Sequence, residues 1–280
     1  MPEISRRASG LGTENAFVVL AEVNALARQG KDIVSFCIGQ PDFPAPDNVQ
    51  EAAIRAIKGG KHGYTPSAGI DELRSAAARY LAGMRGGLPI RAEDVVVGAG
   101  AKPFIAYAIL STTDYGAGDE VIYPNPGFPI YESQIAANGA KPVPIHLHES
   151  RNFSFDPDEL ARLINRKTKL LILNYPHNPT GGCLKKEDLQ AIAEVLKNQP
   201  HVWVYADEIY SRLVFNGEFF SIAQAPVDAL AHQQEIAVPL DDRGHGHRRP
   251  ERSHAAFLVF LRMNSAMRCT PASIACREAA

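Results

Sequence analysis

The segment KLLILNYPHNPTGG, residues 169–182, joins a continuous apolar run to a loop that carries two prolines and two glycines. An apolar run without alternation is typical of a strand covered on both faces, as in the parallel sheets of α/β proteins. The prolines and glycines restrict the loop and hold the amide side chain of Asn178 at a fixed point. We therefore predict a buried strand over Lys169–Leu173 with a polar site at its carboxyl end.

Working outward from this segment, short apolar runs alternate with helical patterns from about residue 92 onward. This alternation is typical of βαβ units and a mainly parallel sheet. The run Lys141–Leu147 contains two prolines that cannot donate ladder hydrogen bonds, so we expect it near a sheet edge. The predicted strands are Asp94–Val97, Glu120–Tyr123, Lys141–Leu147, Lys169–Leu173 and Val202–Tyr205, and the predicted helices cover 102–110, 186–196 and segments beginning near Pro129 and at Asp156.

Before this sheet, helices are expected over Gln50–Lys58 and Asp71–Ala82, in a smaller subdomain or an arm. A chain of 280 residues with 45% hydrophobic content can bury one large core, or one core and a small second domain. Its net charge of -2 favours a small-molecule partner over nucleic acid. The polar N-terminus and the lack of an apolar run of ~20 residues predict a cytoplasmic protein without a membrane partner. The cysteines lack metal-site spacing and are expected to be reduced thiols.

Polar and small residues follow the predicted strands at their carboxyl ends. Ligands of parallel α/β sheets bind there, because helix N-termini converge and loops vary at that edge. We therefore expect one shared ligand to contact residues that follow four of the strands: Gly100, Ala101 and Lys102; Phe128; Asn174, Asn178 and Thr180; and Asp207 and Tyr210.

Two of these features have alternative interpretations. The small residues 98–101 before a helix suit a phosphate, since backbone N–H groups can approach it closely, but they are also typical of tight packing alone. Asp207 is either the N-cap of a helix over Glu208–Tyr210 or a buried carboxylate that needs a cationic or N–H partner.

Four motifs in this order resemble the class I/II aminotransferases, a pyridoxal-phosphate-dependent family of fold type I that includes aspartate aminotransferase. They are IGQPDF at Ile38–Phe43, Tyr64–Pro66 with Gly69 and Leu73–Arg74, the NYPHNPTG loop, and ADEIY at Ala206–Tyr210. The resemblance covers about Phe17 to Pro226.

For the fold, this resemblance implies an α/β large domain with a mainly parallel three-layer sheet, incomplete at its C-terminal side, and N-terminal pieces of a small domain. The predicted division is an arm and small-domain segment over 1–45, the cofactor-binding large domain over 46–226, and an aberrant or poorly ordered tail over 227–280. For function, the resemblance implies transfer of an amino group between an amino acid and a 2-oxo acid, with pyridoxal 5'-phosphate as cofactor.

The resemblance also implies roles for individual residues around the cofactor ring. Asp207 pairs with the protonated pyridine nitrogen and keeps the ring an electron sink. Asn178 and Tyr210 hydrogen-bond the phenolate oxygen, and Phe128 stacks on the ring.

Around the phosphate, the resemblance implies that Gly100, Ala101 and Lys102 hold it, mainly through backbone N–H groups. Tyr64 reaches the phosphate of the neighbouring subunit, which implies a homodimer. Gly39 lies beside the substrate carboxylate.

The pattern departs from the family at its Schiff-base lysine. In the family this lysine lies a few tens of residues after the aspartate–tyrosine motif, in a Ser-x-x-Lys or Ser-Lys segment. Here the last lysine is Lys197, before Asp207. Lys102 is not expected to replace it, because the family often has a lysine there without a covalent role. No catalytic residue is therefore predicted, and covalent and acid–base catalysis of fast transamination is not expected.

Two functions remain open. One is an aminotransferase with impaired or no activity, truncated or frameshifted after about residue 226. The other is a non-catalytic relative that binds pyridoxal phosphate or acts as a regulator through subunit interaction.

The composition changes where the resemblance ends. Residues 1–230 hold 10 Lys and 12 Arg, whereas residues 231–280 hold no Lys and 7 Arg, with 4 of the 9 His. Asp241–Arg252 has no amphipathic period. Three interpretations stay open: a frameshifted reading of a GC-rich gene, a metal site at His245, His247 and His254, or a genuine divergent segment. Ala255–Leu261 is too short to span a membrane and is expected to be an aggregation-prone helix or strand.

Overall fold

The computed structural model describes residues 4–9, 11–12, 15–39, 41, 43–225, 235–238 and 257–261. Its centre is a seven-stranded sheet with the order β1-β7-β6-β5-β4-β2-β3. The strands are β1 Val95–Val97, β2 Glu120–Asn125, β3 Lys141–His146, β4 Thr168–Asn174, β5 Trp203–Asp207, β6 Glu235–Val238 and β7 Phe257–Leu261. Strands β3, β2, β4, β5 and β6 are parallel, and β7 runs antiparallel to β1 and β6. The predicted mainly parallel sheet is confirmed.

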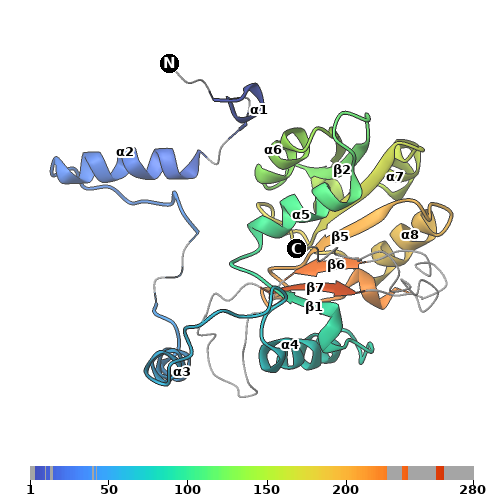
Figure 1. Ribbon diagram of the computed structural model, residues 1–280. Coiled ribbons are helices and arrows are strands. Elements are labelled where there is room, and N and C mark those ends of the chain that lie inside the picture. Colours follow the sequence, from blue (N-terminus) through green and yellow to red (C-terminus); the bar gives the residue numbers. More distant parts are fainter. Residues whose placement is uncertain are drawn as a thin grey trace, which may run out of the picture.

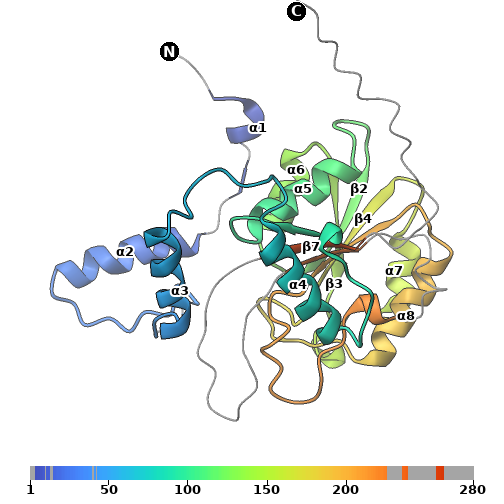
Figure 2. The same cartoon turned by 60° about the horizontal axis from the view of Figure 1, so that its bottom comes forward.

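Helices cover both faces of this sheet (Figures 1 and 2). Within β4, Leu170 and Ile172 pack in a core cluster with α5 and α6, whereas Leu171 and Leu173 pack in a second cluster with α7 and α8. Strand residues that alternate between two apolar layers explain the continuous apolar sequence. The predicted three-layer α/β arrangement is confirmed. The helices are α1 Arg6–Ser9, α2 Ala16–Arg28, α3 Asp47–Lys58, α4 Asp71–Met84, α5 Lys102–Thr112, α6 Ile130–Ala137, α7 Pro157–Leu163 and α8 Lys186–Lys197.

Local sequence patterns predicted the positions of several strands and helices correctly. The proline-containing β3 is an edge strand, as predicted, since it pairs on one side only, with β2. Helix α7 begins with Pro157, and Asp156 caps it by accepting a hydrogen bond from the Asp158 N–H at 3.0 Å. Strand β2 extends two residues beyond its predicted end, to Asn125.

The assignment of Asp71–Ala82 to a smaller subdomain or arm is wrong. Helix α4 packs on the sheet, where Ala77, Ala78 and Leu81 form a buried cluster with Val95 of β1. Apolar residues three and four apart give the helix this buried face.

By contrast, α2 and α3 have no buried residues and lie beside the layered part of the molecule (Figures 1 and 2). Helix α2 was not predicted from the sequence. Several large apolar side chains here are exposed, including Val34, Phe36, Ile54 and Ile57.

Two strands beyond residue 226 join the same sheet. Strand β6 pairs with β5 and with β7. The segment Ala255–Leu261 was expected to form a helix or a strand, and it contains the strand β7. Asp241–Arg252 lies outside the described residues. The domain boundary at 226 stays a prediction.

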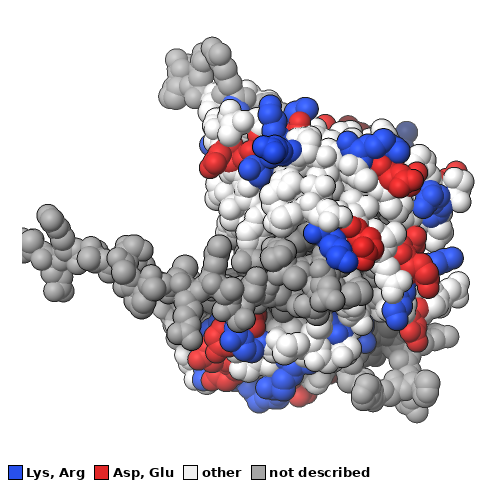
Figure 3. Space-filling view, turned by 90° about the vertical axis from the view of Figure 1, so that its right-hand side faces the viewer, with Lys and Arg blue, Asp and Glu red and all other residues white. Residues whose placement is uncertain are grey.

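Acidic and basic side chains intermingle on the face shown in Figure 3. No helix in the described part of the chain has the length and apolar character that a membrane crossing needs.

Candidate functional site

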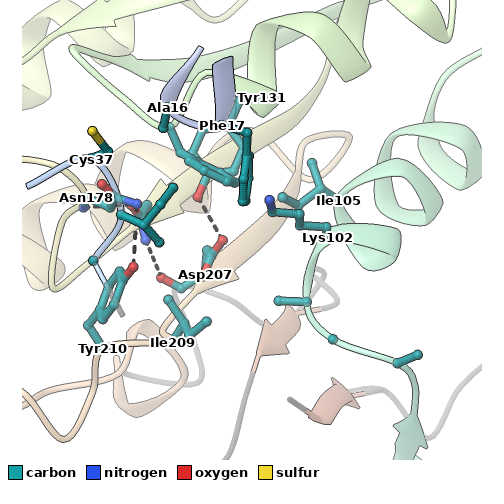
Figure 4. Close-up of a pocket in the computed structure, with 17 residues that line it drawn as sticks. Ala16, Phe17, Cys37, Lys102, Ile105, Tyr131, Asn178, Asp207, Ile209 and Tyr210 are labelled. Carbon is teal, nitrogen blue, oxygen red and sulfur yellow. Dashed lines mark hydrogen bonds between the residues drawn. The ribbon is translucent and has the colours of Figure 1, made fainter. Parts of the chain in front are cut away.

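A cavity of about 590 Å³ opens at the carboxyl ends of the parallel strands, between them and the start of α2 (Figure 4). Nine of the eleven residues predicted to contact a ligand line it: Gly39, Gly100, Ala101, Lys102, Phe128, Asn174, Asn178, Asp207 and Tyr210. Thr180 and Tyr64 do not line it, and the Tyr64 side chain is fully exposed. Gln40 and Asp42 of the IGQPDF motif lie outside the described residues. Segments from residue 16 to residue 210 thus meet around one cavity.

Asp207 is the last residue of β5 and is only 4% exposed. Its Oδ2 accepts a hydrogen bond from the Tyr131 hydroxyl at 2.7 Å, whereas its buried Oδ1 has no hydrogen-bond partner among the described residues. Burial raises the pKa of the Asp207 carboxyl to about 6, against the opposing effect of the Tyr131 hydrogen bond. A half-satisfied buried carboxylate beside a cavity suits a ligand that brings an N–H or a positive charge.

The N-cap interpretation of Asp207 is wrong, because residues 208–210 form a turn and no helix. The Ile209 N–H in this turn still interacts with the Asp207 carboxylate and lowers its pKa.

Tyr131 belongs to the candidate site but was not predicted from the sequence. It lies in α6 with 1% of its surface exposed, and it lines the cavity. Burial and the nearby Asp207 charge raise the pKa of Tyr131 well above its ordinary value, so the hydroxyl stays protonated and donates. The available signal was a tyrosine in the helix predicted to begin near Pro129, since tyrosine hydroxyls that are buried usually have a partner.

The loop after β4 holds Asn178 in place. Asn174 stands opposite Asp207 in the β4–β5 register, and its amide donates to the Asp207 carbonyl at 3.0 Å. The Asn174 Oδ1 accepts from the Asn178 N–H at 3.0 Å, and the Asn178 amide reaches the Tyr210 hydroxyl at 3.5 Å (Figure 4). Two polar side chains therefore meet beside Asp207.

His177 stabilises the same loop from within. Its Nδ1 lies 2.7 Å from the Thr180 hydroxyl, and burial lowers the pKa of His177 to about 4, so the ring is neutral near pH 7. Neither His177 nor Thr180 lines the cavity.

On the opposite side of the cavity, α5 begins at Lys102 after the small residues 98–101. Gly98 serves packing, since a Cβ there would lie 2.4 Å from the Phe104 ring. Gly100 has a φ of +88° and open space around it, and it lines the cavity. The packing interpretation therefore holds for Gly98, whereas the phosphate interpretation stays a prediction for Gly100. The positive end of α5 faces the cavity, as an anion site requires.

Among the described residues that line the cavity, Lys102 is the only lysine, and its Nζ lies 5.5 Å from the centre of the Phe128 ring and 5.9 Å from that of Phe17. For metals, the described residues contain no group of three or more ligating side chains. His245, His247 and His254 lie outside them.

A family model described as aminotransferase class I and II matches residues 31–238. An aspartate aminotransferase from Pyrococcus horikoshii is 39% identical over 196 residues, which cover 70% of this chain and 49% of that protein. An asparagine–oxo-acid transaminase from Streptococcus mutans is 36% identical over 243 residues, covering 85% and 60%. Among solved structures, aspartate aminotransferase from Thermus thermophilus with maleate is 34% identical with a TM-score of 0.78, covering 85% of this chain and 60% of that one. The chain thus spans about half to three fifths of the length of these relatives.

Proposed function

Because the chain belongs to the class I and II aminotransferases, whose aspartate aminotransferase members depend on pyridoxal 5'-phosphate, we propose that its cavity binds this cofactor. The observation that carries the proposal is the buried Oδ1 of Asp207 at the cavity wall, which has no partner among the described residues. A protonated pyridine nitrogen supplies both the charge and the N–H that this oxygen lacks.

The other cavity residues fit the remaining groups of the cofactor. Asn178 and Tyr210 carry hydrogen-bonding groups for its phenolate oxygen, and Phe128 offers an aromatic face. Gly100, Ala101 and Lys102 sit at the N-terminus of α5, where backbone N–H groups and a helix dipole favour a phosphate. When bound, the cofactor supplies an electron sink for charge that develops at the α-carbon of an amino acid. The chain's own residues bind it and keep its ring nitrogen protonated.

For the reaction, we propose transfer of an amino group between an amino acid and a 2-oxo acid, impaired or lost in this chain. The sequence holds no lysine after Lys197. Without that amine, nothing at the expected position can attach the cofactor or move the α-proton. The alternative is a non-catalytic homologue that acts through subunit interaction, in the cytoplasm in either case.

A homodimer is part of this proposal. Tyr64 is fully exposed and lies outside the cavity of its own chain, and α2 and α3 carry exposed apolar residues. We propose that a second copy of the chain covers these exposed apolar side chains, since contiguous exposed apolar patches mark interaction surfaces.

We expect the chain to bind the cofactor without forming a covalent bond to it. Pyridoxamine 5'-phosphate, which has the ring and the phosphate but no aldehyde, should bind at one site per chain by calorimetry. Pyridoxal 5'-phosphate followed by borohydride should give no adduct concentrated at one lysine in peptide mass spectra. A unique adduct, at Lys102 or elsewhere, contradicts non-covalent binding, and absence of binding to either compound contradicts the proposed function.

The nucleotide sequence of the gene distinguishes the two proposed functions. We expect that resequencing across the codons for Ala225–Leu240 and translating all three frames will uncover a Ser-x-x-Lys segment in another frame. Its presence supports an aminotransferase whose reading frame is disturbed. Its absence from every frame supports the non-catalytic homologue.

A further inference from the structure

Behind the cavity wall lies a buried cluster of three polar side chains, Arg85, Glu208 and Ser221, which we call the Arg85 cluster. The Arg85 guanidinium forms a buried ion pair with the Glu208 carboxylate, and both side chains are almost fully buried. The Arg85 Nε donates to the Ser221 Oγ at 3.2 Å, and the Ser221 hydroxyl donates to the Glu208 Oε1 at 2.7 Å. None of the three lines the cavity.

The cluster joins three segments that are far apart in the sequence. Arg85 is the C-cap residue of α4, Ser221 caps the short 3₁₀ helix Ile222–Gln224, and Glu208 directly follows Asp207. Successive residues at a strand end point to opposite sides. The Asp207 side chain therefore faces the cavity while the Glu208 side chain faces the cluster.

A second contact anchors the far end of the same turn. The Arg212 Nε donates to the Tyr80 hydroxyl of α4 at 2.6 Å, and the guanidinium lies 5.0 Å from the centre of the Tyr80 ring. Between the two anchors, Glu208 and Arg212, lie Ile209 and Tyr210, which line the cavity. The turn is held to α4 at both ends.

Burying two charges is costly, and apolar residues of similar size often stabilise a core equally well. The ion pair and its hydrogen bonds instead fix the orientation of the side chains that they join, because hydrogen bonds are directional. We propose that the Arg85 cluster is a positioning device for the ring side of the cavity, which holds the turn 208–212 so that Asp207 and Tyr210 face the ligand. This inference rests on the proposed function.

The test separates positioning from stability. Glu208→Gln should lower the unfolding midpoint and raise the Kd for pyridoxamine 5'-phosphate about tenfold, the effect of one misplaced hydrogen bond. The double variant Arg85→Met with Glu208→Gln removes both buried charges, so it should regain most of the stability while its Kd stays about tenfold raised. Calorimetry and urea unfolding give the two readouts.

The matched control is Glu120→Gln, which weakens the ion pair with Lys141 at the amino ends of β2 and β3, far from the cavity. It should lose stability and keep the wild-type Kd. Inorganic phosphate, which has no ring, should bind all variants equally. Recovery of both stability and Kd in the double variant overturns the inference and leaves only a structural role. A wild-type chain that binds no pyridoxamine 5'-phosphate contradicts the proposed function itself.

Discussion

Replacing Asp207 by asparagine should weaken the binding of pyridoxamine 5'-phosphate at least ~100-fold, because a buried charge pair with the ring nitrogen is lost. The same variant should make the unliganded chain more stable at pH 8. In that chain the carboxylate is buried, and one of its oxygens has no partner among the described residues. Asparagine carries no charge, can still accept from Tyr131, and places its amide toward the cavity.

The pH dependence of unfolding gives the sign of this effect. The folded pKa of Asp207 is about 6, above its ordinary value of 3.8. The folded chain therefore holds this proton more tightly than the unfolded chain does. Its contribution to stability is complete below about pH 4 and is lost as the pH rises through about 6, a difference of roughly 3 kcal/mol. Urea unfolding between pH 4 and pH 8 should show this loss in the wild type and not in Asp207→Asn.

Asp94→Asn is the control for the binding measurement. Asp94 is a buried carboxylate at the amino end of β1 that pairs with Arg91, and it does not line the cavity. This variant should keep the wild-type Kd. If Asp207→Asn also keeps it, then Asp207 does not hold the ring nitrogen.

The residues that line the cavity show which parts of a site can be predicted from the sequence. Asn178, Asp207 and Gly100 were found because each follows a recognisable strand, and parallel strands bring their carboxyl ends to one edge. Their positions need only local pattern and the rule of topology.

Contacts between distant segments left no such signal. Tyr131 and Asp207 are 76 residues apart, and Arg85 and Glu208 are 123 apart. In the sequence, Tyr131 is an ordinary tyrosine of a predicted helix, and Arg85 and Glu208 are charged residues of the kind that usually lie on the surface. The pairing follows from how α6 and α4 pack on the sheet, which single-segment patterns do not specify. Helix α4 shows the same effect, since the sequence predicted a helix there but not the part of the sheet that the helix covers.

The Tyr131–Asp207 contact leads to the second large effect. Tyr131→Phe removes the only side-chain hydroxyl that donates to the Asp207 carboxylate among the described residues. Since this hydrogen bond lowers the pKa of Asp207, its loss should raise that pKa above about 6. Near pH 7 a larger fraction of Asp207 is then protonated and cannot pair with a protonated ring nitrogen. We expect the Kd for pyridoxamine 5'-phosphate to rise roughly 10- to 100-fold, as for a lost hydrogen bond to a charged group.

This effect should depend on pH, which distinguishes it from damage to the fold. At pH values above the raised pKa of Asp207, the carboxylate of the variant ionises again, so part of the lost affinity should return. Tyr205→Phe is the matched control, because Tyr205 is an equally buried tyrosine of β5 whose hydroxyl has no hydrogen-bond partner in the described structure. Removing an unpartnered hydroxyl should leave the Kd unchanged and the free energy of unfolding equal or higher. Equal losses of affinity in Tyr131→Phe and Tyr205→Phe, or a loss in Tyr131→Phe that does not change with pH, mean that Tyr131 acts through packing and not through the charge of Asp207.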